Sequence, residues 1–160
     1  MLRLQEIHLT LQKIIPKSSQ FYALQRQHFL TMEKYLDAGS GSCLLRNRSA
    51  AELVVRELTG LSEWLADVPH YSIMPNHWHA ILVPQPGCQH SLTEMMKRVK
   101  GRSGRSLRQM DHTQGPIWQR EWFDRWLRDD SEYDKTVRYI HENPVKAGLV
   151  SRWEDHPWTH

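Results

Sequence analysis

Apolar and polar residues alternate along short segments of the chain, the pattern of half-buried β-strands. The first segment runs from Ile7 to Ile14, and two more are His70 to Met74 and His77 to Val83. Pro75 and Asn76 separate the latter two and are typical turn residues. We therefore expect these two segments to pair as an antiparallel hairpin.

The segment from Ile117 to Leu127 fits two patterns. Its tryptophans recur every four residues, as on a helix, yet Trp118, Arg120 and Trp122 also alternate as on a strand. We expect a strand over its first half.

Helical spacing of apolar residues predicts helices from Ser49 to Trp64, from Leu92 to about Met110, and from Ser131 onward. Each starts with a serine followed three residues later by an acidic residue, a capping box: Ser49 and Glu52, Ser91 and Glu94, Ser131 and Asp134. Pro144 should end or kink the last helix, and Gly148 is a further stop.

The N-terminal third is patterned less clearly. Residues Phe21 to Leu36 have apolar groups at mixed helical spacing and lead into residues 37–42, a glycine- and serine-rich linker candidate. The order strand, helix, strand, strand, helix, strand, helix predicts an α+β fold of the ferredoxin-like type, an antiparallel sheet with helices packed on it. We expect one domain over residues 1–160, with residues 1–42 its least defined part.

Composition narrows the class of protein. Hydrophobic residues make up 39% of the 160 residues, and the mean hydropathy is −0.65. These values, the lack of a long apolar run and the lack of a secretory signal predict a cytoplasmic protein that crosses no membrane. Cys43 and Cys88 are far apart and form no metal-binding pair, so we expect two free thiols.

Positive charge is local. The formal net charge is only +3, but six basic residues fall within the stretch 97–108, which contains no acidic residue. Such a run is more often a solvated helix face than a nucleic-acid site when it stands alone.

His77 and His79 flank Trp78 at the start of the second hairpin strand. Because strand side chains alternate between faces, both imidazoles should project to one side and converge. Two histidines can neighbour each other by chance, but Asn143 could supply a third ligand. A mixed nitrogen and oxygen set with open positions fits Mg²⁺ or Mn²⁺ better than a structural zinc.

Tyr139 lies four residues before Asn143, so a helix places both on one face. A tyrosine commonly packs its ring in a core with its hydroxyl reaching water. Tyr139, however, lies off the apolar stripe of Tyr133, Val137 and Ile140. As a nucleophile, a phenol of reference pKa near 10 needs a nearby base or cation.

These residues carry a resemblance to a known family. The runs from Met74 to His79, from Trp118 to Arg120 and from Tyr139 to Val150 resemble the REP-associated tyrosine transposases, which belong to the HUH single-strand DNA nucleases. The likeness extends from about Leu36 to Trp158 and includes Lys100.

The resemblance implies a metal-dependent single-strand DNA endonuclease and strand-transferase. It implies that His77, His79 and Asn143 bind a divalent metal and that Tyr139 attacks a phosphodiester, leaving a 5′-phosphotyrosine and a free 3′-hydroxyl. The implied partners are hairpins of repeated extragenic palindromes, bound by a monomer or a homodimer.

Candidate phosphate contacts are the following basic residues: Lys97, Lys100, Arg102, Arg105 and Arg120. Trp78, Trp118 or Trp122 could stack on bases, but large aromatics dominate cores and we expect core packing. Two other functions remain open. One is a noncatalytic, domesticated or degenerate transposase that binds the same hairpins, and the other is a small-molecule metal hydrolase.

Overall fold

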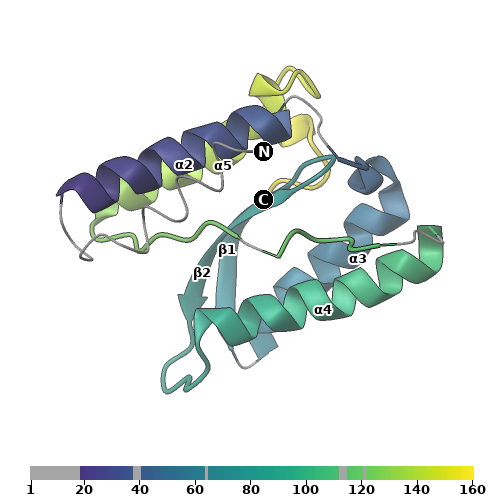
Figure 1. Ribbon diagram of the computed structural model, residues 1–160, viewed down its shortest axis with the longest axis horizontal. Helices are drawn as coiled ribbons and strands as arrows, with labels where there is room; N and C mark the ends of the chain where they lie inside the picture. Colours follow the sequence, from purple (N-terminus) through teal and green to yellow (C-terminus); the bar gives the residue numbers. More distant parts are fainter. Residues whose placement is uncertain (1–18, 38–40, 64, 112–114, 121) are drawn as a thin grey trace. The chain divides into compact units, whose positions relative to one another are not determined.

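The computed structural model describes residues 19–37, 41–63, 65–111, 115–120 and 122–160. The chain divides into two compact units, with the boundary between Ser42 and Cys43. In the first unit the helix α2, Ser19–Asp37, covers the segment of mixed helical spacing (Figure 1). The strand expected over residues 7–14 lies outside the described residues.

A two-stranded antiparallel sheet lies at the centre of the second unit (Figure 1). It consists of β1, Ala66–Ile73, and β2, Trp78–Pro84, so the predicted hairpin is confirmed. The pairing has an irregularity between Asp67 and His70. Pro69 falls in this interval, and a proline has no N–H to donate to a strand ladder, which fits a bulge.

The other edge of β1 pairs with the end of the chain. The backbone N–H of Tyr71 donates to the carbonyl of His160, and the N–H of His160 donates back to Tyr71. The N–H of Ile73 donates to the carbonyl of Trp158. The C-terminal residues therefore satisfy an edge of β1 that would otherwise be unpaired.

One face of the sheet carries the hydrophobic core. Tyr71 and Ile73 of β1 and Trp78, Ala80 and Leu82 of β2 pack on it against two helices. These are α3, Arg48–Thr59, and α4, Leu92–Asp111. Leu58, Val54 and Val99 are completely buried there, each worth roughly 1.5–3 kcal/mol of hydrophobic stabilisation.

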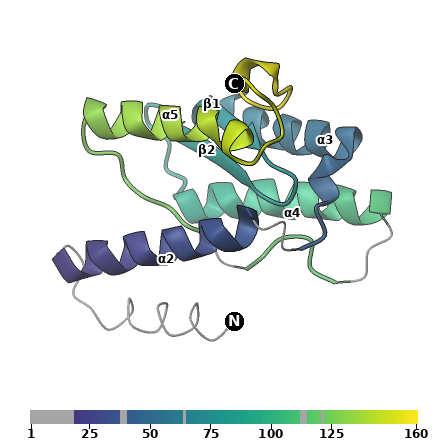
Figure 2. The same ribbon diagram turned by 90° about the horizontal axis from the view of Figure 1, so that it is seen from above.

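The opposite face of the sheet is covered by α5, Asp130–Lys146. Ile140 of α5 is buried, and the ring of Tyr133 lies edge-on to His70 of β1. Figure 2 shows the sheet between α5 on one side and α4 on the other. The fold is α+β with helices packed on an antiparallel sheet, so the predicted class is confirmed.

Two of the three predicted helix starts were wrong. Only the Ser91 and Glu94 box is present, with the N–H of Ser91 donating to the Glu94 carboxylate and the N–H of Glu94 to the Ser91 hydroxyl. The cap of α3 is Asn47, whose side chain accepts from the N–H of Ala50. The cap of α5 is Asp129, which accepts from the N–H of Glu132. In each case a better acceptor stands two residues earlier.

The strand expected between residues 117 and 122 was wrong, because the described residues there are irregular. Trp118 holds this segment on α4: its indole N–H donates to the Ser103 hydroxyl at 2.9 Å. A Cβ at Gly104 would lie 3.2 Å from Cδ1 of Trp118, so the indole would have to shift by a few tenths of an ångström to accept one. Trp118 and Trp78 both pack against the core, as expected, but Trp122 is exposed, so the expectation of core packing was wrong for it.

The sequence predicted that the last helix ends or kinks at Pro144, with Gly148 as a further stop. The helix does not end at Pro144 but continues to Lys146. It ends in a Schellman motif, with the N–H of Gly148 donating to Val145 and the N–H of Leu149 donating to Pro144. Gly148 has the positive φ of +67° that this ending needs. Asn143 is therefore inside the helix, one turn after Tyr139.

Within the described part of the chain, no helix combines the length and apolar character needed to cross a membrane. Both cysteines are free thiols, as expected.

Candidate active site

The imidazoles of His77 and His79 meet at one point on the sheet face that α5 covers. Trp78, between them, packs into the core on the other face. The two Nε2 atoms are 3.0 Å apart and the ring planes are nearly perpendicular, at 82°. The structure thus shows the convergence of rings that strand alternation predicted.

Both imidazoles are neutral at pH 7. Burial lowers the pKa of His77 to about 4, and burial together with the neighbouring His77 lowers the pKa of His79 to about 3. Nδ1 of His77 donates to Oδ1 of Asn76 at 2.7 Å. This hydrogen bond fixes the tautomer of His77 and leaves its Nε2 lone pair directed at His79.

This pair of nitrogens could hold a metal ion. Two nitrogens that bind the same cation at about 2.0–2.1 Å each lie roughly 3.0–3.4 Å apart, and the observed separation of 3.0 Å fits that range. Neutral imidazoles with a tautomer set by an outer hydrogen bond are also the usual form of metal-binding histidines.

Tyr139 of α5 lies against this pair. Its ring centroid is 5.4 Å from that of His79, and the two rings meet edge to face at 79°. Tyr139 is only partly buried, in keeping with its position off the apolar stripe. The structure therefore brings a phenol and two imidazoles from distant parts of the sequence into one cluster.

Asn143 is 3% exposed on α5, and its Nδ2 has no hydrogen-bond partner among the described residues. A buried amide N–H without a partner costs about 1–3 kcal/mol. It is a donor that an oxygen of a bound ligand can satisfy, whereas a cation would bind Oδ1 of the same amide.

Two further residues of α5 lie close to Tyr139. Nζ of Lys146 is 5.5 Å from the centroid of the Tyr139 ring and 2.8 Å from a carboxylate oxygen of Glu142. The hydrogen bond and the charge of Lys146 lower the pKa of Glu142, with a smaller effect from Arg138. The sequence did not suggest Lys146, because Pro144 seemed to end the helix before it.

The five basic candidates for DNA contacts lie elsewhere. Four are on α4, which covers the opposite face of the sheet from α5, and Arg120 is in the irregular segment that follows (Figure 2). Lys97, Arg105 and Arg120 are exposed. Lys100 donates to the carbonyl of Gln119 and lies over the ring of Trp122, and Nε of Arg102 is 2.8 Å from Glu57. Lys100 and Arg102 therefore have internal contacts.

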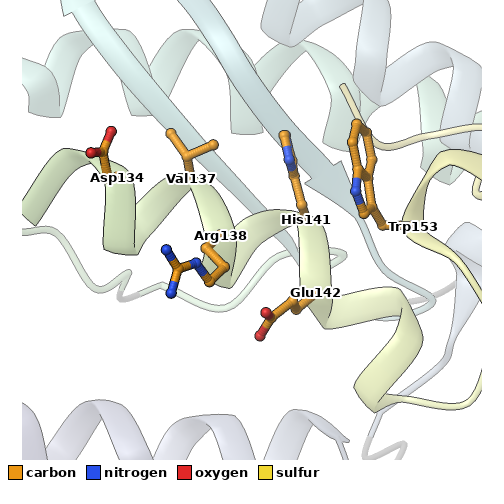
Figure 3. Close-up of a pocket in the computed structure, with 6 residues that line it drawn as sticks. All are labelled: Asp134, Val137, Arg138, His141, Glu142 and Trp153. Atoms are coloured by element: carbon orange, nitrogen blue, oxygen red, sulfur yellow. The ribbon is translucent and has the colours of Figure 1, made fainter.

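A shallow cavity of about 330 Å³ opens on another flank of α5. Figure 3 shows His141 and Trp153 side by side, with ring centroids 4.1 Å apart, while Arg138 and Glu142 point to another side of the helix. The remaining lining residues are Asp134 and Val137. Neither Tyr139 nor the histidine pair lines this cavity, so it is separate from the cluster.

Comparison with known proteins gives the class of protein. The IS200-like transposase family matches residues 52–143, more than half of the chain and a range that contains His77, His79, Tyr139 and Asn143. The chain belongs to the family of IS200-like transposases.

A curated relative from Haemophilus influenzae (strain Rd) points to a narrower group. It is 29% identical over 96 residues, 54% of this chain, and its name provisionally makes it a REP-associated tyrosine transposase. The match spans about half the length of that relative, 54%. No solved structure matches the chain. The family resemblance inferred from the sequence is confirmed.

Proposed function

We propose that this transposase is a metal-dependent, single-strand DNA endonuclease and strand-transferase of the HUH type, with Tyr139 as its nucleophile. The observation that carries the proposal is the position of the Tyr139 ring, 5.4 Å from that of His79, whose Nε2 is 3.0 Å from that of His77. A nucleophile and a pair of metal-binding nitrogens side by side are the parts that phosphodiester cleavage needs.

In the proposed reaction, the Tyr139 oxygen loses its proton and attacks the phosphorus of a phosphodiester in single-stranded DNA. A bond from that oxygen to phosphorus forms as the bond to the 3′-oxygen breaks. The 3′-oxygen takes a proton and leaves as a hydroxyl, and the downstream strand stays attached as a 5′-phosphotyrosine. Attack of a 3′-hydroxyl on this linkage reverses the exchange, so the strand can be joined without ATP.

His77, His79 and Asn143 would hold the divalent cation, Mg²⁺ or Mn²⁺. When bound, the cation would polarise the phosphate and offset the negative charge that develops on it. Two imidazoles in the set favour Mn²⁺ over Mg²⁺, because Mg²⁺ prefers oxygen ligands.

The proposed substrate is a DNA hairpin of the repeated extragenic palindrome type, flanked by a single strand. Lys97, Arg102, Arg105 and Arg120 are exposed, but Arg102 is paired with Glu57, so the other three are the first candidates for phosphate contacts. We further propose a cytoplasmic location and a monomeric or homodimeric state.

A labelled oligonucleotide pool tests the proposal. The pool holds hairpins flanked by randomised single strands, labelled at the 3′ end, and is incubated with the protein and Mn²⁺ before denaturing electrophoresis. We expect a covalent adduct that carries the 3′ label, because the downstream fragment stays on the protein. Chelation of the metal should abolish it.

Matched variants assign the residues. Tyr139→Phe should lose the adduct but keep hairpin binding, and Tyr133→Phe, a change of the same kind on the same helix, should keep both. Equal adduct yield from Tyr139→Phe would refute the nucleophile. Tight hairpin binding by the wild-type protein with no adduct under any metal condition would instead indicate a noncatalytic DNA-binding protein.

A further inference from the structure

One stripe of α5 carries four polar side chains in succession. Tyr139, Glu142, Asn143 and Lys146 are spaced at i, i+3, i+4 and i+7, which places them along one side of a helix. The first and third are already part of the proposed site. The other two form an ion pair, with Nζ of Lys146 2.8 Å from a carboxylate oxygen of Glu142.

The position of Lys146 is more specific than that of an ordinary surface lysine. Its ammonium lies over the Tyr139 ring, 5.5 Å from the centroid. The side chain of Lys146 is 55% exposed, so a ligand can reach it. The ion pair with Glu142 restricts the flexible Lys146 side chain to the side of α5 that carries Tyr139. A cation that takes part in a reaction is expected to be held in position in this way before the substrate reacts.

We propose that the Lys146 ammonium contacts a non-bridging oxygen of the phosphate that Tyr139 attacks, and that Glu142 positions it there. This inference rests on the proposed function, because it requires Tyr139 to be the nucleophile. Lys146 is then a second catalytic residue, and Glu142 is a positioning residue that acts through it.

The chemistry needs no proton transfer from Lys146. Phosphoryl transfer spreads negative charge over the oxygens of the phosphate, and a cation already held near them stabilises the transition state. The ammonium forms no covalent bond and provides a positive charge over the Tyr139 ring.

A merely structural role is the competing explanation. A glutamate followed four residues later by a lysine stabilises a helix slightly, and a cation near the C-terminus of a helix interacts favourably with its dipole. Either effect would change the stability of the protein. Neither would change the rate of adduct formation at saturating DNA in a protein that remains folded.

The test measures single-turnover adduct formation with Mn²⁺ over a range of hairpin concentrations, which separates the maximal rate from the apparent Kd. Lys146→Gln should lower the maximal rate by about 10- to 100-fold, with a much smaller change in Kd, as for the loss of one charge-stabilising group. Lys146→Arg keeps the charge and should recover most of the rate, and Glu142→Gln should give an intermediate rate.

Arg152→Gln is the matched control. Arg152 is an exposed cation in an ion pair with Glu154, outside the cluster, so its loss should leave the maximal rate unchanged. We measure the melting temperature and the Mn²⁺ affinity of every variant. These two values identify a variant that has lost the fold and not only the charge. Lys146→Arg then decides whether the charge is needed.

Each outcome is informative. If the wild-type adduct depends on Tyr139 and Lys146→Gln matches its rate, only this inference fails. It also fails if Lys146→Arg is as slow as Lys146→Gln, or if the whole loss appears in Kd. If the wild-type protein gives no Tyr139-dependent adduct, the proposed function itself fails.

Discussion

The Nε2 atoms of His77 and His79 face each other at 3.0 Å, although the side chain between them points into the core on the opposite face of the sheet. Because both rings are neutral and only the folded protein holds the two nitrogens together, a divalent cation should bind to the folded protein in preference to the unfolded chain.

Mn²⁺ should therefore raise the melting temperature. At a concentration of about one hundred times Kd, the expected stabilisation is about 2.7 kcal/mol. His77→Ala should remove the shift, whereas His90→Ala, a change at an exposed histidine just before α4, should keep it. Differential scanning calorimetry measures both, and an equal shift in the two variants would show that the ion binds elsewhere.

Two glycines of α4 should respond oppositely to substitution. Gly104 faces Trp118, where a Cβ would lie 3.2 Å from the ring, so Gly104→Val should cost about 1–3 kcal/mol through overpacking. Gly101 has nothing within 4 Å of such a Cβ, and Gly101→Ala should stabilise the helix by roughly 0.5–1 kcal/mol. Urea unfolding of the two variants gives the comparison, and a loss of stability in both would contradict it.

The stability of the protein should fall as the pH is lowered, and His156 should contribute to this fall. Burial lowers the pKa of His156 below its ordinary value of 6.5. Below about pH 6.5 the unfolded chain therefore binds a proton that the folded protein resists, and the free energy of unfolding decreases. The buried His77 and His79 act in the same direction.

The contribution of His156 is isolated by comparison with His156→Asn. Urea unfolding of both proteins between about pH 8 and about pH 5 should give a free energy of unfolding that depends less on pH in the variant. The variant lacks the imidazole that takes up a proton more readily in the unfolded chain than in the folded protein. Identical slopes would show that His156 is protonated as easily in the folded protein as in the unfolded one.

Local signals in the sequence predicted the central part of the fold. The hairpin was predictable because Pro75 and Asn76 punctuate two alternating segments, and the start of α4 because Ser91 and Glu94 satisfy each other within one turn. The end of the chain was not predictable in this way. Its pairing with Tyr71 depends on an edge that only the folded sheet provides.

Tertiary contacts explain the main errors. Alternation suggested a strand around Trp118, but its indole packs on Gly104 and donates to Ser103, which fixes an irregular backbone instead. The local bias of Pro144 against helix was outweighed by its burial and by the Schellman ending at Gly148.

Local signals in the sequence also predicted part of the candidate site. Strand alternation predicted that the rings of His77 and His79 converge, and helical spacing predicted that Tyr139 and Asn143 share one face. Both were predictable because each rule acts within a single element. Lys146 was missed because its place beside Tyr139 requires the helix to pass through Pro144. Asn76 was interpreted only as a turn residue, and its hydrogen bond to His77 was not foreseen.

The central claim is that Tyr139 becomes covalently joined to DNA, and peptide mapping by mass spectrometry tests it most directly. The protein is incubated with Mn²⁺ and the hairpin pool, digested with nuclease and protease, and its peptides are searched for a nucleotide remnant. We predict a 5′-linked nucleotide on Tyr139 and on no other tyrosine. A remnant on a different residue of an otherwise active protein would contradict the account.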